Sequence, residues 1–186
     1  ELYELNVFLA EEVSSLRAQL PEDGQGVMES SFSSSSEKAQ QARISYDTLE
    51  AEYPTLFSGY SAPKSVLASQ LMSWCDITGI FVPFTFEANV NVDVPDYSQP
   101  ATMCHELSHL RGYMREDEAN FIAYLACIHS ESAEFQYSGK MLAYIYVFNA
   151  LFAEDPQAAQ EISASLGEGA RMDLNANNAY WDQFES

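Results

Sequence analysis

The chain has 186 residues, of which 47% are hydrophobic, and a formal net charge of −20 at pH 7. This length and composition predict one folded domain with its own core, and they exclude a disordered chain. The acidic excess argues against nucleic acid and anionic lipid surfaces as partners, because both repel an acidic face.

Two helices are predicted in the first 60 residues, over 4–20 and 37–53. In the first, apolar residues recur at the three- and four-residue spacing of a helix, and Pro21 ends it. The second ends before Pro54, since the residue before a proline is disfavoured in a helix. A serine-rich segment, 30–36, is predicted to be a loop between them.

Three segments in the middle of the chain are rich in β-branched and aromatic residues and are bounded by Gly or Pro, which predicts strands over 63–68, 77–82 and 87–94. In the third, Val90, Val92 and Val94 alternate with polar residues, as in a half-buried strand.

Helical patterns return in the second half of the chain. They predict helices over 101–110, 115–130 and 133–153, and one or two polar helices in 156–186 that are interrupted at Gly167 and Gly169. The predicted class is therefore α+β, mainly helical with a small mixed sheet. We expect a single domain over 1–186, with an N-terminal helical part (1–60), a sheet with two site helices (61–131) and C-terminal helices (132–186).

The stretch His105-Glu106-Leu107-Ser108-His109 carries the clearest chemical signal. Residues four apart lie on one face of a helix, so His105 and His109 can both face a single metal ion. Glu106 stands beside the first histidine, where it can take a proton from a water molecule on the metal. The motif predicts a zinc hydrolase that cleaves a peptide bond.

A catalytic zinc site needs a third protein ligand. The only other histidine, His129, falls on the wrong face of the 115–130 helix, so a carboxylate is expected. Glu116 and Glu118 point to nearly opposite sides, and only one of them can be the ligand. Glu116 is favoured because Asn120, one turn further on, could hydrogen-bond a ligand histidine.

The connection between the two site helices is short. Gly112 predicts a sharp turn, and Arg115 stands where a third histidine would extend the motif in some zinc peptidases. A guanidinium stays protonated and cannot bind zinc. The turn is therefore expected to lead directly into the helix of Glu116, so that two helices pack closely.

The predicted activity is peptide-bond hydrolysis by a metal-activated water, with one Zn²⁺ per chain held by His105, His109 and Glu116. Glu106 is the predicted general base, and it returns the proton to the leaving amine. The expected partner is a peptide or protein substrate. The alternative is a catalytically inactive, zinc-peptidase-like binding module of a membrane protein.

Three cysteines, Cys75, Cys104 and Cys127, show no metal-type spacing and cannot all pair with one another. Cys104 and Cys127 fall within the two site helices and are predicted to be small core residues.

Three segments carry a family resemblance: 83–91, 104–112 and 115–121, supported by 137–139 and 149–151. A histidine pair followed by Glu-x-x-Ala-Asn resembles the gluzincin branch of the zincin metallopeptidases. More closely, these segments resemble an uncharacterised family of membrane-tethered bacterial proteins described as zinc peptidases. The resemblance covers about 63–151.

The resemblance implies a zincin-like fold in which an edge strand precedes the metal-binding helix and binds an extended substrate by strand addition. The segment 87–94 is the candidate for that strand, with an ordinary half-buried strand as the other possibility. Zinc peptidases also use a Tyr or His to stabilise the oxyanion, and Tyr137, Tyr144 and Tyr146 are equal candidates here.

The same resemblance implies a location at the extracytoplasmic face of the bacterial cell membrane. The sequence has no stretch long and apolar enough for a membrane span and no signal peptide. We therefore expect a fragment whose membrane anchor lies outside this chain.

Overall fold

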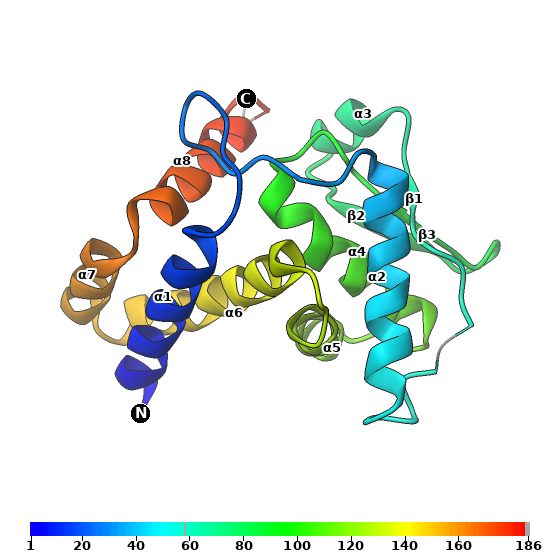
Figure 1. Cartoon of the computed structure of the whole chain (residues 1–186), viewed down its shortest axis with the longest axis horizontal. Coiled ribbons are helices and arrows are strands. Elements are labelled where there is room, and N and C mark those ends of the chain that lie inside the picture. Colours follow the sequence, from blue (N-terminus) through cyan, green and yellow to red (C-terminus); the bar gives the residue numbers. More distant parts are fainter. Residues whose placement is uncertain (58, 185–186) are drawn as a thin grey trace.

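The computed structural model describes residues 1–57 and 59–184 and is mostly helical (Figure 1). In chain order its elements are α1 (Leu2–Arg17), α2 (Ser35–Glu50), β1 (Lys64–Ser65), α3 (Ser69–Ser73), β2 (Gly79–Val82), β3 (Glu87–Val90), the 3-10 helix η1 (Asp96–Ser98), α4 (Gln99–Leu110), α5 (Glu116–Ile128), α6 (Ala133–Glu154), α7 (Pro156–Ser165) and α8 (Glu168–Asp182). Together with its small sheet, this composition confirms the α+β class.

The sheet is mixed, with the order β1-β3-β2. β1 runs parallel to β3, and β2 pairs with β3 in the antiparallel sense. The prediction that 87–94 is an edge strand is therefore wrong. β3 is the central strand, and β1 and β2 are the two edge strands. The ladder gives way just after β3: the Asn91 N–H still donates to the Thr78 carbonyl at 2.9 Å, but the Val92 N–H donates to Ser69 Oγ at 2.9 Å.

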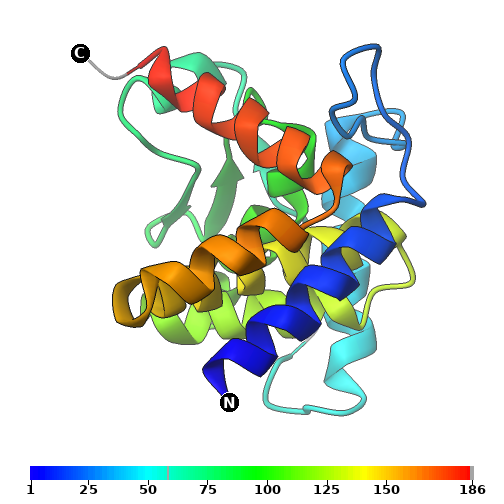
Figure 2. The same cartoon turned by 90° about the vertical axis from the view of Figure 1, so that its left-hand side faces the viewer.

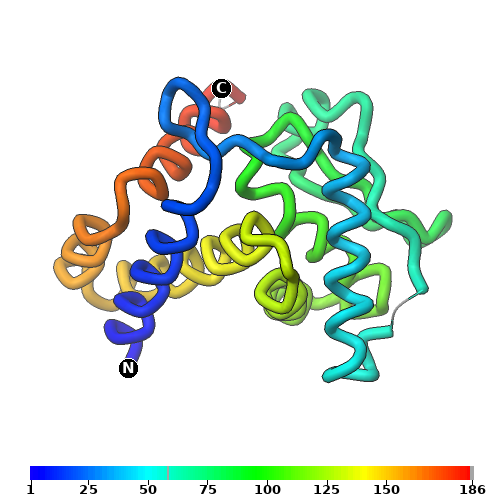
Figure 3. The backbone as a smooth tube through the Cα atoms, in the orientation of Figure 1, coloured from blue at the N-terminus to red at the C-terminus, as the bar shows by residue number. Residues whose placement is uncertain are grey.

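Two hydrophobic clusters form the interior of the protein. The first contains buried residues of α2, β3, α4 and α5, and the second contains buried residues of α1, α6, α7 and α8. Figure 3 shows α6 (yellow) extending from beside α5 towards α7, and Figure 2 shows the face on which α1 and α7 lie. Phe135 near the start of α6 belongs to the first cluster and Met141 to the second, so α6 joins them.

The C-terminal part forms two helices, the second of the two alternatives that the sequence left open for 156–186. α7 ends at Ser165 and α8 begins at Glu168, so the predicted break at Gly167 is confirmed. Gly167 donates its backbone N–H to Ser14 Oγ at 2.8 Å. The predicted interruption at Gly169 is wrong: this residue lies inside α8, where it packs closely against the Arg17 side chain.

The serine-rich segment is held to the body of the protein by the start of α6. The Glu134 carboxylate accepts hydrogen bonds from Ser30 Oγ and from the backbone N–H and Oγ of Ser31. Ser34 then caps α2 by accepting from the Glu37 N–H at 3.2 Å.

Within the described residues, every helix is too short or too polar to pass through a bilayer.

Candidate metal centre

The two motif histidines project from the C-terminal half of α4. His105 and His109 lie one turn apart on the same face, with ring centroids 4.6 Å apart and planes at 90°. Helix periodicity alone gives this arrangement.

Contacts from neighbouring helices hold α4 in place. On its buried side, the Tyr46 hydroxyl of α2 donates to the Cys104 carbonyl at 2.6 Å and lies 2.7 Å from Ser108 Oγ. At its N-terminal end, the Ala101 N–H donates to Ser138 Oγ of α6 at 3.0 Å. A free N–H of the first helical turn is thereby satisfied.

A glycine turn connects α4 to α5. Gly112 has φ +94°, a left-handed conformation that glycine adopts without steric cost. The turn brings the Tyr113 carbonyl to 2.8 Å from His109 Nδ1. Because a carbonyl only accepts, this contact puts the proton on Nδ1 and leaves the Nε2 lone pair free.

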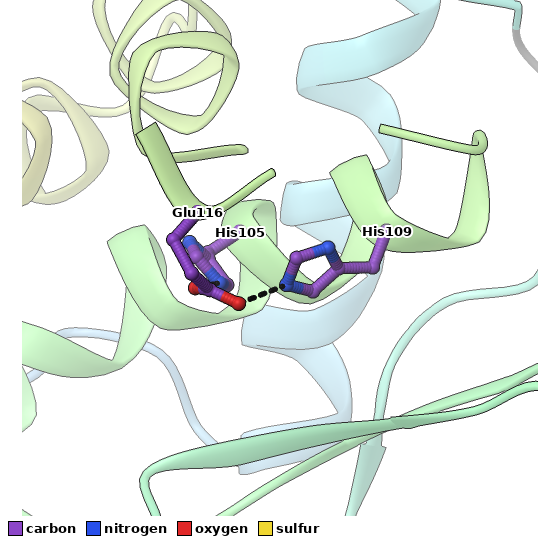
Figure 4. Close-up of side chains that lie close together, drawn as sticks. All are labelled: His105, His109 and Glu116. Carbon is purple, nitrogen blue, oxygen red and sulfur yellow. Dashed lines mark ion pairs between the residues drawn. The ribbon is translucent and has the colours of Figure 1, made fainter. Parts of the chain in front are cut away.

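Glu116, the first residue of α5, faces both histidines (Figure 4). One carboxylate oxygen lies 3.2 Å from His105 Nε2, and the other lies 3.6 Å from His109 Nε2. Potential ligand atoms of the three residues all lie within 4.8 Å of one another. These are the three residues that the sequence predicts as ligands, and together they can hold a metal ion.

Glu118 lies apart from this cluster. One of its carboxylate oxygens is 4.0 Å from an Arg115 guanidinium nitrogen, and the side chain is about half exposed. The preference for Glu116 over Glu118 thus agrees with the geometry, because the two residues leave α5 on different sides.

Asn120 lies where the sequence predicts, one turn beyond Glu116. Its Oδ1 is 2.8 Å from His105 Nδ1, and its Nδ2 donates to the Tyr146 hydroxyl at 2.8 Å. Burial, followed by the proximity of His109, lowers the pKa of His105. Both effects favour the neutral imidazole, which is the form that binds metal ions.

Glu106 is almost fully buried, with 5% of its surface exposed. Its Oε2 has no hydrogen-bond partner among the described residues. Burial, and secondarily the negative charge of Glu116, raise the pKa of Glu106 to about 8. A buried carboxyl with an unsatisfied oxygen beside a cluster that can hold a metal ion is a candidate acid–base group.

Gly79 of β2 makes room for that carboxyl. A Cβ placed on Gly79 would lie 2.5 Å from Glu106 Oε1, closer than a real contact allows. The sequence prediction did not include Gly79, because the contact joins a strand and a helix that are far apart in the chain.

A cavity of about 720 Å³ opens in front of these residues. Its lining includes the β2 edge, the exposed faces of α4 and α5, one side of α6, and Trp181 of α8. Of the three candidate tyrosines, Tyr146 lines the cavity. Tyr137 is buried and donates to Asp173, and Tyr144 is buried outside the cavity wall.

The remaining histidine and the cysteines lie elsewhere. His129 Nε2 is 3.1 Å from a Glu52 oxygen at the far end of α5, as its position on the wrong face predicts. Cys104 and Cys127 are buried in the first hydrophobic cluster, which confirms that they are core residues, and Cys75 is exposed.

The motif 137–139 has a structural explanation. Tyr137 donates to the buried Asp173, and Ser138 caps α4. Gly139 allows α6 to approach α5, since a Cβ there would lie 2.4 Å from Cys127 Cβ. In the sequence, only the resemblance of this segment to the bacterial family pointed to these residues.

Fold and site together define a mainly helical α+β protein with a His–His–Glu cluster that can hold a metal ion at the wall of a cavity. The chain belongs to the family described as "Protein of unknown function (DUF3810)", which matches residues 1–186. Comparison with curated proteins and with solved structures gave no match.

Proposed function

We propose that this protein is a zinc-dependent peptidase with a zincin-like domain of the gluzincin type. The observation that carries the proposal is the convergence of His105, His109 and Glu116 beside the buried Glu106, at the wall of one cavity. The resemblance of the three motif segments to membrane-tethered zinc peptidases agrees with it. We extend the proposal to one domain over the whole chain, acting at the extracytoplasmic side of a membrane to which it is anchored.

The donor set fits zinc. Two imidazole nitrogens and one carboxylate form the usual ligand set of a catalytic zinc that keeps a position open for substrate or water. With one ligand atom taken from each residue, the three atoms lie within 4.8 Å of one another, which is close enough for one ion to contact all three. Hydrogen bonds at both Nδ1 atoms leave the Nε2 atoms for the metal.

Zinc, when bound, acts as a Lewis acid that polarises a carbonyl and makes a water molecule more acidic. Glu106 accepts the proton of the attacking water and passes it to the leaving amine, so one carboxyl acts first as base and then as acid. Without a metal, the pKa of about 8 keeps Glu106 largely protonated at neutral pH. The positive charge of a bound zinc would lower this pKa and free the carboxylate to act as the base.

The β2 edge gives an extended peptide a place to bind. β2 pairs with β3 on one side, and its residues Gly79, Ile80 and Phe81 line the cavity. A substrate backbone can add to this edge and lie along the histidines. Tyr146, held by Asn120 at the cavity wall, is the best placed of the tyrosines to donate to a developing oxyanion.

The alternative is a binding module that holds zinc without catalysis. The buried, unsatisfied carboxyl of Glu106 favours the enzyme, because a purely structural zinc site gives that residue no role and normally has four protein ligands.

The first test measures zinc per chain by elemental analysis in the parent protein and in Glu116→Ala and Glu118→Ala. We expect about one zinc in the parent and in the Glu118 variant, and loss of zinc in the Glu116 variant. Loss of zinc only in Glu118→Ala would move the third ligand. Absence of zinc from the parent after incubation with the metal would refute the zinc site.

The second test screens the parent and Glu106→Gln against a peptide library. We expect the variant to retain zinc and to lose hydrolysis, by about a hundredfold or more, because the general base is gone. Hydrolysis that survives this change would refute the mechanism. A zinc-loaded parent that binds peptides and cleaves none would favour the binding module.

A further inference from the structure

A second, smaller cavity adjoins the main one. It has a volume of about 160 Å³ and is lined by Ser73, Trp74, Asp76, Trp181 and Phe184. Asp76 and Trp181 line both cavities, so the two adjoin at these residues. The smaller cavity has several times the roughly 30 Å³ that one water molecule occupies, which leaves room for a side-chain head group.

Three aromatic rings surround this space. The ring centroids of Trp74 and Phe184 are 5.2 Å apart at 85°, and those of Trp181 and Phe184 are 6.2 Å apart at 61°. Trp74 is 63% exposed, so the cavity is open to solvent. A cation that enters this cavity would meet aromatic side chains on several sides, and tryptophan is the aromatic side chain that attracts cations most strongly.

Asp76 supplies a negative charge at the junction of the two cavities. It follows α3 with φ +55°, in the left-handed region, where an aspartate is tolerated less well than a glycine. Two backbone hydrogen bonds fix this turn. The Asp76 N–H donates to the Ser73 carbonyl at 3.1 Å, and the Ile77 N–H donates to the Met72 carbonyl at 2.9 Å.

The ionisable side chains around the two cavities include acidic residues but no lysine or arginine among the described residues. The acidic residues that line the two cavities are Asp76, Glu116 and the protonated Glu106. The whole chain has eight lysines and arginines against 28 acidic residues. A cationic group that enters the smaller cavity therefore meets the Asp76 carboxylate and no lysine or arginine side chain.

We propose that Trp74, Trp181, Phe184 and Asp76 form a cation-binding subsite of the peptide cavity, which selects substrates that carry an arginine or lysine side chain or a free N-terminal ammonium. A guanidinium or ammonium stacks on the tryptophan faces and pairs with the Asp76 carboxylate. This inference rests on the proposed function, because it takes the occupant of the main cavity to be a peptide.

The path of the peptide supports this assignment. Asp76 and Thr78 line the main cavity directly ahead of β2, and Gly79 of β2 contacts Glu106. A peptide that pairs with the β2 edge would therefore pass Asp76 within a few residues of the bond at the metal centre.

The chain offers its own reporter of binding, because it contains two tryptophans and both line this subsite. The experiment titrates tryptophan fluorescence of the Glu106→Gln protein, which leaves the peptide intact, with Ac-Ala-Ala-Arg-Ala-Ala-NH2. The matched probe replaces arginine with citrulline, a neutral group of nearly the same shape. We expect saturable binding of the arginine peptide, weakened by salt, and roughly tenfold weaker binding of the citrulline peptide.

Two variants in the same background separate Asp76 from the general acidity of the protein. Asp76→Asn removes the charge and keeps a residue that tolerates the left-handed turn, and it should weaken arginine-peptide binding by roughly tenfold. Asp182→Asn removes an equal charge beside Trp181 from a residue outside both cavity linings, and binding should stay within about twofold.

Two further probes identify the source of the cation. A lysine peptide of the same design tests the ammonium side chain, and an all-alanine peptide amide of the same length with a free N-terminus tests the terminal ammonium. Charge-dependent binding of any of these, lost in Asp76→Asn, supports the subsite. Equal binding of the arginine and citrulline peptides, or no fluorescence change with any cationic probe in the folded protein, refutes it.

The outcome is independent of catalysis. If the protein binds the arginine peptide more tightly than the citrulline peptide but holds no zinc and cleaves no peptide, the cation subsite stands and the proposed peptidase activity is refuted. Zinc-dependent cleavage by the parent with equal rates on both peptides would support the peptidase and refute the subsite.

Discussion

At the scale of single residues, Glu106 is the most unusual group of the site. It combines near-complete burial, an oxygen without a partner among the described residues and a pKa raised to about 8. Burial penalises the charged form, so the folded protein holds a proton on Glu106 at pH values where an unfolded chain has released it. This difference makes stability depend on pH.

The folded protein binds the Glu106 proton more tightly than the unfolded chain does between pH 4.5 and about 8. The contribution of Glu106 to the free energy of unfolding is therefore fully present below pH 4.5, and it is lost as the pH rises through about 8. Glu106→Gln removes the effect. Relative to the parent, we expect its free energy of unfolding to rise with pH across this window, by roughly 1–4 kcal/mol. Denaturant titrations at several pH values, with a chelator present, check this. A difference that stays constant with pH would contradict the raised pKa.

Gly79 leads to a second prediction at this scale. In Gly79→Ala the new Cβ would collide with the Glu106 carboxyl and displace it, while the histidines and Glu116 stay in place. We expect zinc content to be unchanged and peptide hydrolysis to fall by about tenfold or more, since a small misplacement of a catalytic group is costly. Gly24→Ala is the control, because nothing lies within 4 Å of its added Cβ. Equal activity of the two variants would show that Gly79 does not position Glu106.

At the scale of elements, the site depends on the turn between α4 and α5. Gly112 lets the chain reverse, so that Glu116 faces the histidines that precede the turn. The same turn supplies the Tyr113 carbonyl that orients His109. A short connection between two closely packed helices thus builds the whole donor set.

Gly112→Ala should lower the stability of the protein by about 1 kcal/mol, because alanine is strained at positive φ. It should also weaken zinc binding by about tenfold, since it disturbs the hydrogen bond to His109, a proposed zinc ligand. Gly26→Ala is the matched control: it also has positive φ with open space around it, in a loop away from the site. It should lose similar stability and keep its zinc affinity, measured by competition with a chelator. Equal zinc affinities of the two variants would contradict a role for the turn in the site.

At the scale of the whole molecule, a buried ion pair joins helices that are distant in the chain. Asp173 of α8 is fully buried and accepts from Arg17 Nε at 2.7 Å, the Met28 N–H at 2.7 Å and the Tyr137 hydroxyl at 2.6 Å. These contacts connect α8 with α1, with the loop after α1 and with α6. Because α6 also caps α4 through Ser138, the second cluster is linked to the metal centre.

Asp173→Ala removes the buried carboxylate partner of Arg17 and leaves it only the more exposed Glu22 and the Gly26 carbonyl. This change should lower the free energy of unfolding by about 3–5 kcal/mol. Asp182→Ala, on the exposed side of the same helix, should change it by less than about 0.5 kcal/mol. Chemical denaturation of both variants measures the difference. If Asp173→Ala does not fold, Asp173→Asn retains part of the acceptor capacity and should show a smaller loss in the same direction. Equal stability of the Asp173 and Asp182 variants would contradict the importance of this pair.

Much of the site could be predicted from the sequence because it depends on helix periodicity. His105, His109 and Asn120 needed only the spacing of residues along a helix, and the preference for Glu116 over Glu118 rested on the same rule. Gly79 and Ser138 could not be derived in this way, because each acts through a contact with α4 from another element. No local pattern encodes such contacts.

The sequence by itself determined roughly where the long helices lie, which face of α4 carries the histidines and that a break falls at Gly167, because these features depend on neighbouring residues. Only the tertiary structure decided that β3 is the central strand and β2 the edge strand at the cavity. It also decided that Tyr146 reaches the site and how deeply Glu106 is buried. Strand order, side-chain access and desolvation arise from contacts between distant segments, and those contacts exist only once the chain has folded.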